Sequence, residues 1–147
     1  MTREYLIQEA IKIKSPSAPS AREYLDKSEV MTAEVNKLML ERPDLEKLIG
    51  KDSQAMMIDN HNNHSRFMVS LVRDFNAEVL VDTVIWVFRA YRAHGFQLTY
   101  WPAQLNCWMT VIRKHLSPES FDHIAPVYQF MIVNQASFAR LSQSDTL

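Results

Sequence analysis

Apolar side chains recur at intervals of three and four residues along most of this chain, which is the spacing of one buried face of an α-helix. Alternating apolar and polar runs rich in β-branched residues, which would indicate strands, are absent from the sequence. The sequence contains only two glycines, Gly50 and Gly95, so tight turns between antiparallel strands would lack their usual residues. The pattern predicts an all-α protein.

Capping and helix-breaking residues divide the chain into segments. A short helix is expected over residues 2–13 and a long one over residues 20–41, where Ser20 and Glu23 have the spacing of a capping box. Pro43 suits the start of a brief helix, which Gly50 can close in a left-handed conformation. Further helices are predicted over residues 53–75, 77–94, 99–116 and 118–142.

Single residues set the boundaries of these later helices. The expected N-caps are Asn76, Thr99 and Ser117. Gly95 is expected to end the helix over residues 77–94, and Pro126 should kink or split the last helix. The whole chain, residues 1–147, fits one domain, in which residues 1–19 form an N-terminal helix and linker and residues 142–147 form a polar tail that frays.

The predicted helix over residues 53–75 carries two histidines on its apolar stripe. That stripe, at spacings of four, three, four, three and four, consists of Met57, His61, His64, Met68, Leu71 and Phe75. A buried imidazole needs a hydrogen-bond partner, a metal ion or a polar ligand. Histidines bonded to backbone or Asn would explain the pattern equally well. The spacing of His61 and His64 is a weak zinc signal, because no third ligand is nearby.

The predicted helix over residues 77–94 supplies a facing apolar surface. Its stripe contains Leu80, Val84, Val87, Tyr91 and His94, with Val81, Ile85 and Phe88 beside it. If this helix faces the previous one, His61 and His64 on one side and Tyr91 and His94 on the other would bracket a flat apolar ligand. Met68, Val84, Val87 and Phe88 would line that cleft. Alternatively, Tyr91 is a core tyrosine and His94 is a helix-end residue favoured by the dipole.

Composition excludes several classes of function. With 16 basic and 17 acidic residues, the chain has no electrostatic footprint for nucleic acid or an anionic membrane. The apolar stretch from Val79 to Phe88 is interrupted by Asp82 and is about half the ~20 residues that a membrane-spanning helix needs. A single cysteine, Cys107, and no secretion signal lead us to expect a cytoplasmic protein. No catalytic triad, paired carboxylates or phosphate loop can be identified, so we do not expect an enzyme.

From Leu80 onward the sequence resembles bacterial globins. Gly95-Phe96, Tyr100-Trp101 and Tyr128 match the scheme in which a ligating helix ends in Gly, an aromatic residue opens the next helix and the last helix contains a Tyr. The resemblance implies a globin-like helical sandwich with an N-terminal helical extension and a tetrapyrrole between two helices. Tyr91 stands where a globin has its ligating His, so the resemblance implies that His94 or Tyr91 would hold the haem iron. His64, 30 residues before His94, would lie on the opposite side of the haem.

The departures from ordinary globins resemble branches that do not carry oxygen. Asn63-His64 before Phe67 and the run from Trp86 to Trp101 look most like the group related to phycobiliproteins and associated with bilin synthesis. This resemblance implies a homodimer that binds haem or a bilin, and Cys107 lies too late in the chain for the usual covalent attachment. The alternative is a haem-free sensor globin, empty or binding a fatty acid, that acts through dimerisation and a protein partner.

Overall fold

The protein is wholly helical in the part that its computed structural model describes, residues 2–143, where no strand occurs. The helices are α1 (Arg3–Ile11), α2 (Ala18–Leu40), α3 (Leu45–Ile49), α4 (Gln54–Arg73), α5 (Ala77–Ala93), α6 (Tyr100–His115), α7 (Pro118–Val133) and α8 (Gln135–Ser142). This confirms the predicted all-α class. Most of the predicted frayed tail lies outside the described residues, but Ser142 itself is the last residue of α8 and is buried.

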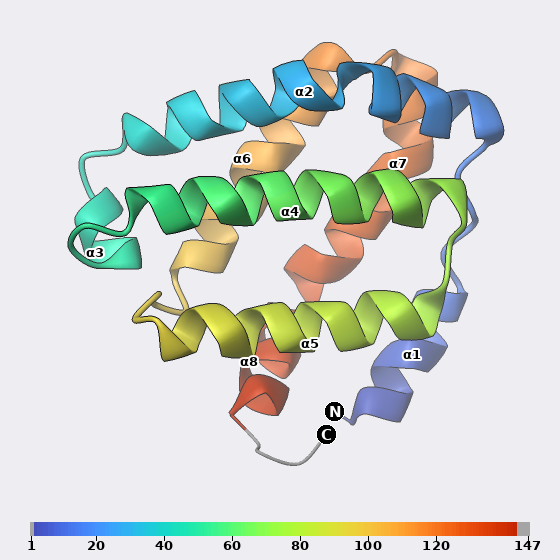
Figure 1. The fold of residues 1–147 in the computed structure, drawn as a ribbon. Helices are drawn as coiled ribbons and strands as arrows, with labels where there is room; N and C mark the ends of the chain where they lie inside the picture. Colours follow the sequence, from blue (N-terminus) through green and yellow to red (C-terminus); the bar gives the residue numbers. More distant parts are fainter. Residues whose placement is uncertain (1, 144–147) are drawn as a thin grey trace.

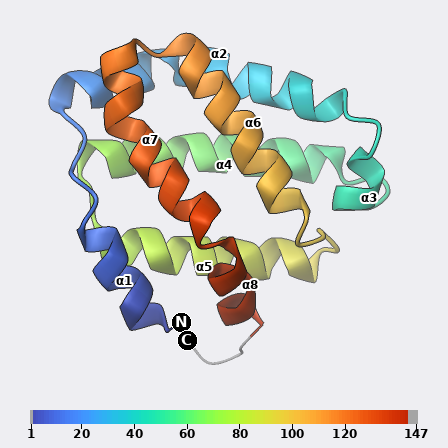
Figure 2. The same cartoon turned by 180° about the vertical axis from the view of Figure 1, so that it is seen from behind.

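The helices form two layers that cross each other. Figure 1 shows α2, α4 and α5 stacked in one layer, and Figure 2 shows α6 and α7 side by side in the layer behind it. The short helices α1 and α8 both pack against α5. The arrangement is consistent with the predicted globin-like sandwich, with α1 as its N-terminal extension. The large side chains of Trp108, Tyr24, Tyr100 and Tyr128 are fully buried between the layers.

Gly95 ends α5 as predicted. It has φ of +93°, a conformation that residues with a Cβ rarely adopt. Its N–H donates to the carbonyl of Arg92, and the N–H of Phe96 donates to the carbonyl of Tyr91, which is the hydrogen-bond pattern of a Schellman motif. The rings of Tyr91 and Phe96 pack 5.1 Å apart across the turn. The motif therefore fixes both the end of α5 and the position of Tyr91.

Three of the predicted helix boundaries differ from the structure. Helix α2 is capped by Ser17, whose Oγ accepts the N–H of Ser20, so the predicted capping box at Ser20 is wrong. Helix α7 runs unbroken through Pro126 to Val133, and the break follows at Asn134. Pro126 removes only the bond to the carbonyl of Asp122, an exposed residue, where water can replace it. Thr99 precedes α6 without capping it through its side chain.

The N-caps of α5 and α7 agree with prediction, and the residue that ends α3 agrees in part. Asn76 and Ser117 accept the N–H groups of Val79 and Ser120. Gly50 ends α3 with a positive φ of 89°, as expected, but with ψ of 170°, an extended conformation open to glycine alone.

Glu23 has a different role from the predicted one, because it joins α2 to the start of α7. Its carboxylate accepts the N–H and the hydroxyl of Ser117 at 2.6 and 2.8 Å and the hydroxyl of Ser120 at 2.7 Å. Burial alone would raise the pKa of Glu23, but these bonds and one from Lys27 outweigh it and lower the pKa to about 2. The residue satisfies free donors at the start of α7 and holds the two layers together at one end.

Candidate functional site

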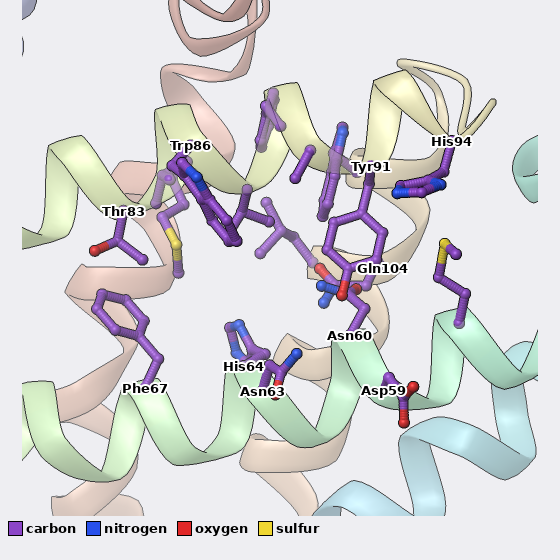
Figure 3. Close-up of a pocket in the computed structure, with 18 residues that line it drawn as sticks. Asp59, Asn60, Asn63, His64, Phe67, Thr83, Trp86, Tyr91, His94 and Gln104 are labelled. Carbon is purple, nitrogen blue, oxygen red and sulfur yellow. The ribbon is translucent and has the colours of Figure 1, made fainter. Parts of the chain in front are cut away.

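A cavity of about 580 Å³ separates α4 from α5. The two helices lie side by side but share almost no close backbone contacts. Figure 3 shows side chains from both helices pointing into the space between them, with further side chains from the layer behind. The volume falls within the range of roughly 300–1,000 Å³ that is typical of small-molecule sites.

The cavity wall is mostly apolar and partly aromatic. Its apolar side chains are Met56, Phe67, Val84, Trp86, Val87, Phe88, Ala90, Trp101, Leu105 and Met131. The rings of Phe88 and Trp101 stack 4.5 Å apart at an interplanar angle of 9°. The stacked pair joins α5 to α6 and forms a rigid aromatic part of the wall.

Six of the eight predicted site residues line this cavity. They are His64, Val84, Val87, Phe88, Tyr91 and His94. The other two, His61 and Met68, do not reach it and are fully buried in the interior. The expectation that both histidines of α4 converge on one cleft with Tyr91 and His94 is therefore wrong for His61.

His61 makes hydrogen bonds within the protein. Its Nδ1 lies 2.6 Å from Oδ1 of Asn36 on α2, and its Nε2 lies 3.2 Å from the hydroxyl of Tyr100 on α6. Burial lowers the pKa of His61 to about 4, so the ring is neutral at pH 7. Its two bonds link α4 to α2 and α6, which is the alternative role considered for it from the sequence.

His64 borders the cavity and is the first member of a hydrogen-bond chain. Its Nε2 lies 2.8 Å from the hydroxyl of Tyr128, which lies 2.8 Å from the hydroxyl of Tyr24. Its ring packs 4.6 Å from that of Trp108. Burial, with a smaller contribution from His61, lowers the pKa of His64 to about 3, so this ring too is neutral at pH 7.

The direction of that chain fixes the proton on His64. If Nε2 donated to Tyr128, and Tyr128 to Tyr24, the fully buried hydroxyl hydrogen of Tyr24 would have no acceptor. In the reverse direction Tyr24 donates to Tyr128, Tyr128 donates to Nε2, and every hydroxyl hydrogen is used. The neutral ring then carries its proton on Nδ1. His64 thus offers a hydrogen-bond donor to the cavity, and its Nε2 lone pair is engaged.

Tyr91 and His94 differ in their burial. Tyr91 is half-buried, its ring meets that of Trp101 edge-on at 6.0 Å, and its hydroxyl makes no hydrogen bond within residues 2–143. Figure 3 shows Tyr91 projecting from α5 toward α4, and His94 at the end of the cavity. His94 is the exposed C-cap of α5. Of the two, Tyr91 is the group held inside the cavity.

Two buried carboxamides in the wall, Asn60 and Gln104, were not predicted. Asn60 is 3% exposed, and its Oδ1 accepts the Tyr100 hydroxyl at 2.7 Å. Gln104, on α6, is 1% exposed, and its Oε1 has no hydrogen-bond partner among the described residues. Gln104 lies three residues after Trp101 and four before Trp108, so a polar residue on that apolar stripe was the available signal.

Comparison with protein-family models, curated proteins and solved structures finds no match to this chain. Within residues 2–143, no group of three or more His, Cys, Asp or Glu side chains is arranged to hold a metal ion. In the same part of the chain, no helix is long and apolar enough to cross a membrane.

Proposed function

We infer that this protein binds a tetrapyrrole, haem or a bilin, noncovalently in the cavity between α4 and α5. The observation that carries the proposal is the cavity itself: two helices are held apart by about 580 Å³ of mostly apolar space beside a stacked aromatic pair. A flat, largely apolar macrocycle or its linear counterpart is a ligand of matching shape. The proposal places the chain in the globin superfamily, in the branch related to phycobiliproteins and bilin synthesis.

The cavity side chains fit haem through a limited set of groups. Tyr91 offers an unpaired hydroxyl, and tyrosine ligates ferric haem in other proteins. His94 could ligate iron only at the exposed end of the cavity. His64 offers the cavity its Nδ1–H, and its Nε2 lone pair, which could ligate iron, is already bonded to Tyr128. When bound, haem would supply an iron centre, and a bilin would supply a visible chromophore that needs no axial ligand.

Cys107 supports a noncovalent mode of binding. The thiol does not line the cavity, and burial raises its pKa to about 11. The thiolate is the reactive form of cysteine, so it is scarce here at neutral pH. Any tetrapyrrole in the cavity would be held by packing and hydrogen bonds.

Filling the cavity is expected to weaken binding. Val87 lines the cavity, whereas Val79 is an exposed residue of the same helix outside it. We expect Val87→Trp to weaken haemin or biliverdin binding at least about tenfold, equivalent to ~1.4 kcal/mol, and Val79→Trp to change it by less than about threefold. Visible absorption titrations of the purified protein measure both. Equal effects of the two substitutions, or no binding of either ligand to the unmodified protein, would contradict the proposal.

One observation favours the alternative, a haem-free sensor globin that acts through dimerisation and a protein partner. Trp86 and Val79 are 62% and 47% exposed and lie seven residues apart on one face of α5. Exposed large apolar side chains on one face are typical of contact surfaces. We expect a dimer in sedimentation at tens of micromolar, roughly the range in which a weak interface fills, and a shift toward monomer on Val79→Lys. A monomer at every concentration would rule out this mode of action.

A further inference from the structure

The carboxamide of Gln104 is unusual among the buried polar groups of this protein. It is 1% exposed, it lines the cavity, and neither of its amide atoms makes a hydrogen bond within residues 2–143. His61 and Asn60 nearby both have partners, whereas Nε1 of the buried Trp108, on the same helix as Gln104, lacks one within residues 2–143. Buried polar groups in folded proteins are almost always hydrogen-bonded, because an unmet one costs stability. Gln104 therefore has the properties of a group whose partner arrives with a ligand.

The geometry of a carboxamide restricts what that partner is. Gln104 offers one carbonyl acceptor and one N–H donor side by side. A lactam ring offers the matching pair, an N–H donor beside a carbonyl acceptor. Linear tetrapyrroles end in two lactam rings. Haem has none, its four nitrogens are bound to iron, and its carboxylates are acceptors only, so haem leaves the Oε1 of Gln104 without a donor.

The charge of the cavity favours neutral ligand groups at its inner wall, and it places the propionates, which haem and biliverdin share, at the open end. No lysine or arginine is among the described residues that line it, and its acidic residue, Asp59, is exposed at the edge. Carboxylates enclosed in the cavity would therefore have no cation to pair with. The neutral groups of the wall, His64 Nδ1–H, the Tyr91 hydroxyl and Gln104, suit neutral carbonyl and N–H groups instead. Figure 3 shows Gln104 reaching into the space between α4 and α5, on the same side as Tyr91.

We propose that Gln104 pairs with a terminal lactam of a linear tetrapyrrole and so makes the cavity selective for a bilin over haem. This rests on the proposed tetrapyrrole-binding function and names the ligand class within it. The pairing requires the lactam ring to lie at the inner wall formed by α6, with the rest of the ligand along the Phe88 and Trp101 rings toward the open end.

Three probes separate the features of the ligand. Biliverdin carries lactams and propionates, protoporphyrin IX carries pyrrole N–H groups and propionates without lactams, and haemin carries neither lactams nor free N–H groups. Their affinities are measured by absorption and by quenching of tryptophan fluorescence. The variant is Gln104→Met, which keeps the length of the side chain, with Asn106→Met as the control, because Asn106 is an exposed carboxamide of the same helix that does not line the cavity. Gln104→Leu serves as a second removal of the carboxamide, and circular dichroism checks the fold of each variant.

We expect biliverdin to bind at least about tenfold more tightly than haemin. Gln104→Met should weaken biliverdin binding at least about tenfold and change haemin and protoporphyrin IX binding by less than about threefold, while Asn106→Met leaves all three affinities within about threefold. Haemin binding as tightly as biliverdin, or Gln104→Met and Gln104→Leu leaving biliverdin unaffected, overturns the selectivity but leaves tetrapyrrole binding intact. Equal losses of biliverdin and protoporphyrin IX overturn the lactam pairing. Binding of none of the probes removes the proposed function as well.

Discussion

Lowering the pH from 7 to 5 is expected to reduce the free energy of unfolding by about 3 kcal/mol. The cause is the pair of neutral histidines on α4, because burial lowers the pKa of His61 to about 4 and that of His64 to about 3. In the unfolded chain both titrate near pH 6.5. As the pH falls through 6.5, both histidines therefore become protonated in the unfolded state. In the folded state they become protonated only near pH 4 for His61 and pH 3 for His64.

The sign of the effect follows from this difference. Between pH 6.5 and about 4 the unfolded state binds more protons, so stability rises with pH and is lost on acidification. Each histidine contributes at most about 1.4 kcal/mol per pH unit in that window. His64 borders the cavity and is partly accessible, whereas His61 is fully buried, so we assign the larger share to His61. Glu23, with its pKa of about 2, loses its contribution only below about pH 4.5.

Urea unfolding curves at pH 7, 6 and 5 measure the effect. The informative quantity is the slope of stability against pH, because substitutions also change stability at pH 7. His61→Gln should reduce that slope to less than half, and Asn62→Gln, next to it on α4, replaces no titrating group and should leave the slope unchanged. Stability that is constant or higher at pH 5 would show that the two rings are not held neutral.

Tyr128→Phe is expected to lower the free energy of unfolding by about 3 kcal/mol. The substitution removes one oxygen but leaves two buried groups without a partner, Nε2 of His64 and the hydroxyl of Tyr24. Tyr24→Phe should cost less, about 1 kcal/mol, because Tyr128 can still donate to His64. This order of effects follows from the position of Tyr128 in the middle of the hydrogen-bond chain, where it takes part in both bonds.

Tyr91→Phe is the matched control for this series. The Tyr91 hydroxyl makes no hydrogen bond within residues 2–143, so its loss should change stability by less than about 0.5 kcal/mol. Chemical denaturation of the three variants in the absence of ligand gives the comparison. If Tyr128→Phe is as mild as Tyr91→Phe, the chain is not a source of stability. If Tyr24→Phe is the costlier of the two buried changes, the bond between Tyr128 and His64 adds no stability.

Short-range signals in the sequence predicted the helices well. The caps at Asn76 and Ser117 and the stop at Gly95 each depend on bonds between residues three to five positions apart, which a local pattern records. Glu23 was misassigned because its partners, Ser117 and Ser120, lie more than 90 positions away. A local capping pattern cannot distinguish a bond within a helix from one across the fold.

The stripe of α4 that faces the cavity is shifted by one residue from the predicted stripe. This shift decides which side chains of α4 line the cavity. The stripe at the cavity is Met56, Asn60, Asn63 and Phe67, with His64 at its edge. The predicted stripe, from Met57 through His61 to Met68, lies about 100° further around the helix and faces α2 and the interior. Both stripes have helical spacing and apolar members. The periodicity therefore located a buried face without showing which neighbour covers each part of it.

The separation of α4 from α5 means that the width of the cavity is controlled from outside it. Helix α5 is held by α1 and α8, and α4 is held by α2. On α1, Leu6 and Ala10 are fully buried, while Arg3 reaches Asp82 of α5 at 2.6 Å. None of these residues lines the cavity. A ligand that contacts both α4 and α5 would couple the α2–α4 pair to the group formed by α1, α5 and α8. Substitutions in α1 would then change ligand affinity by shifting α5, which forms one wall of the cavity.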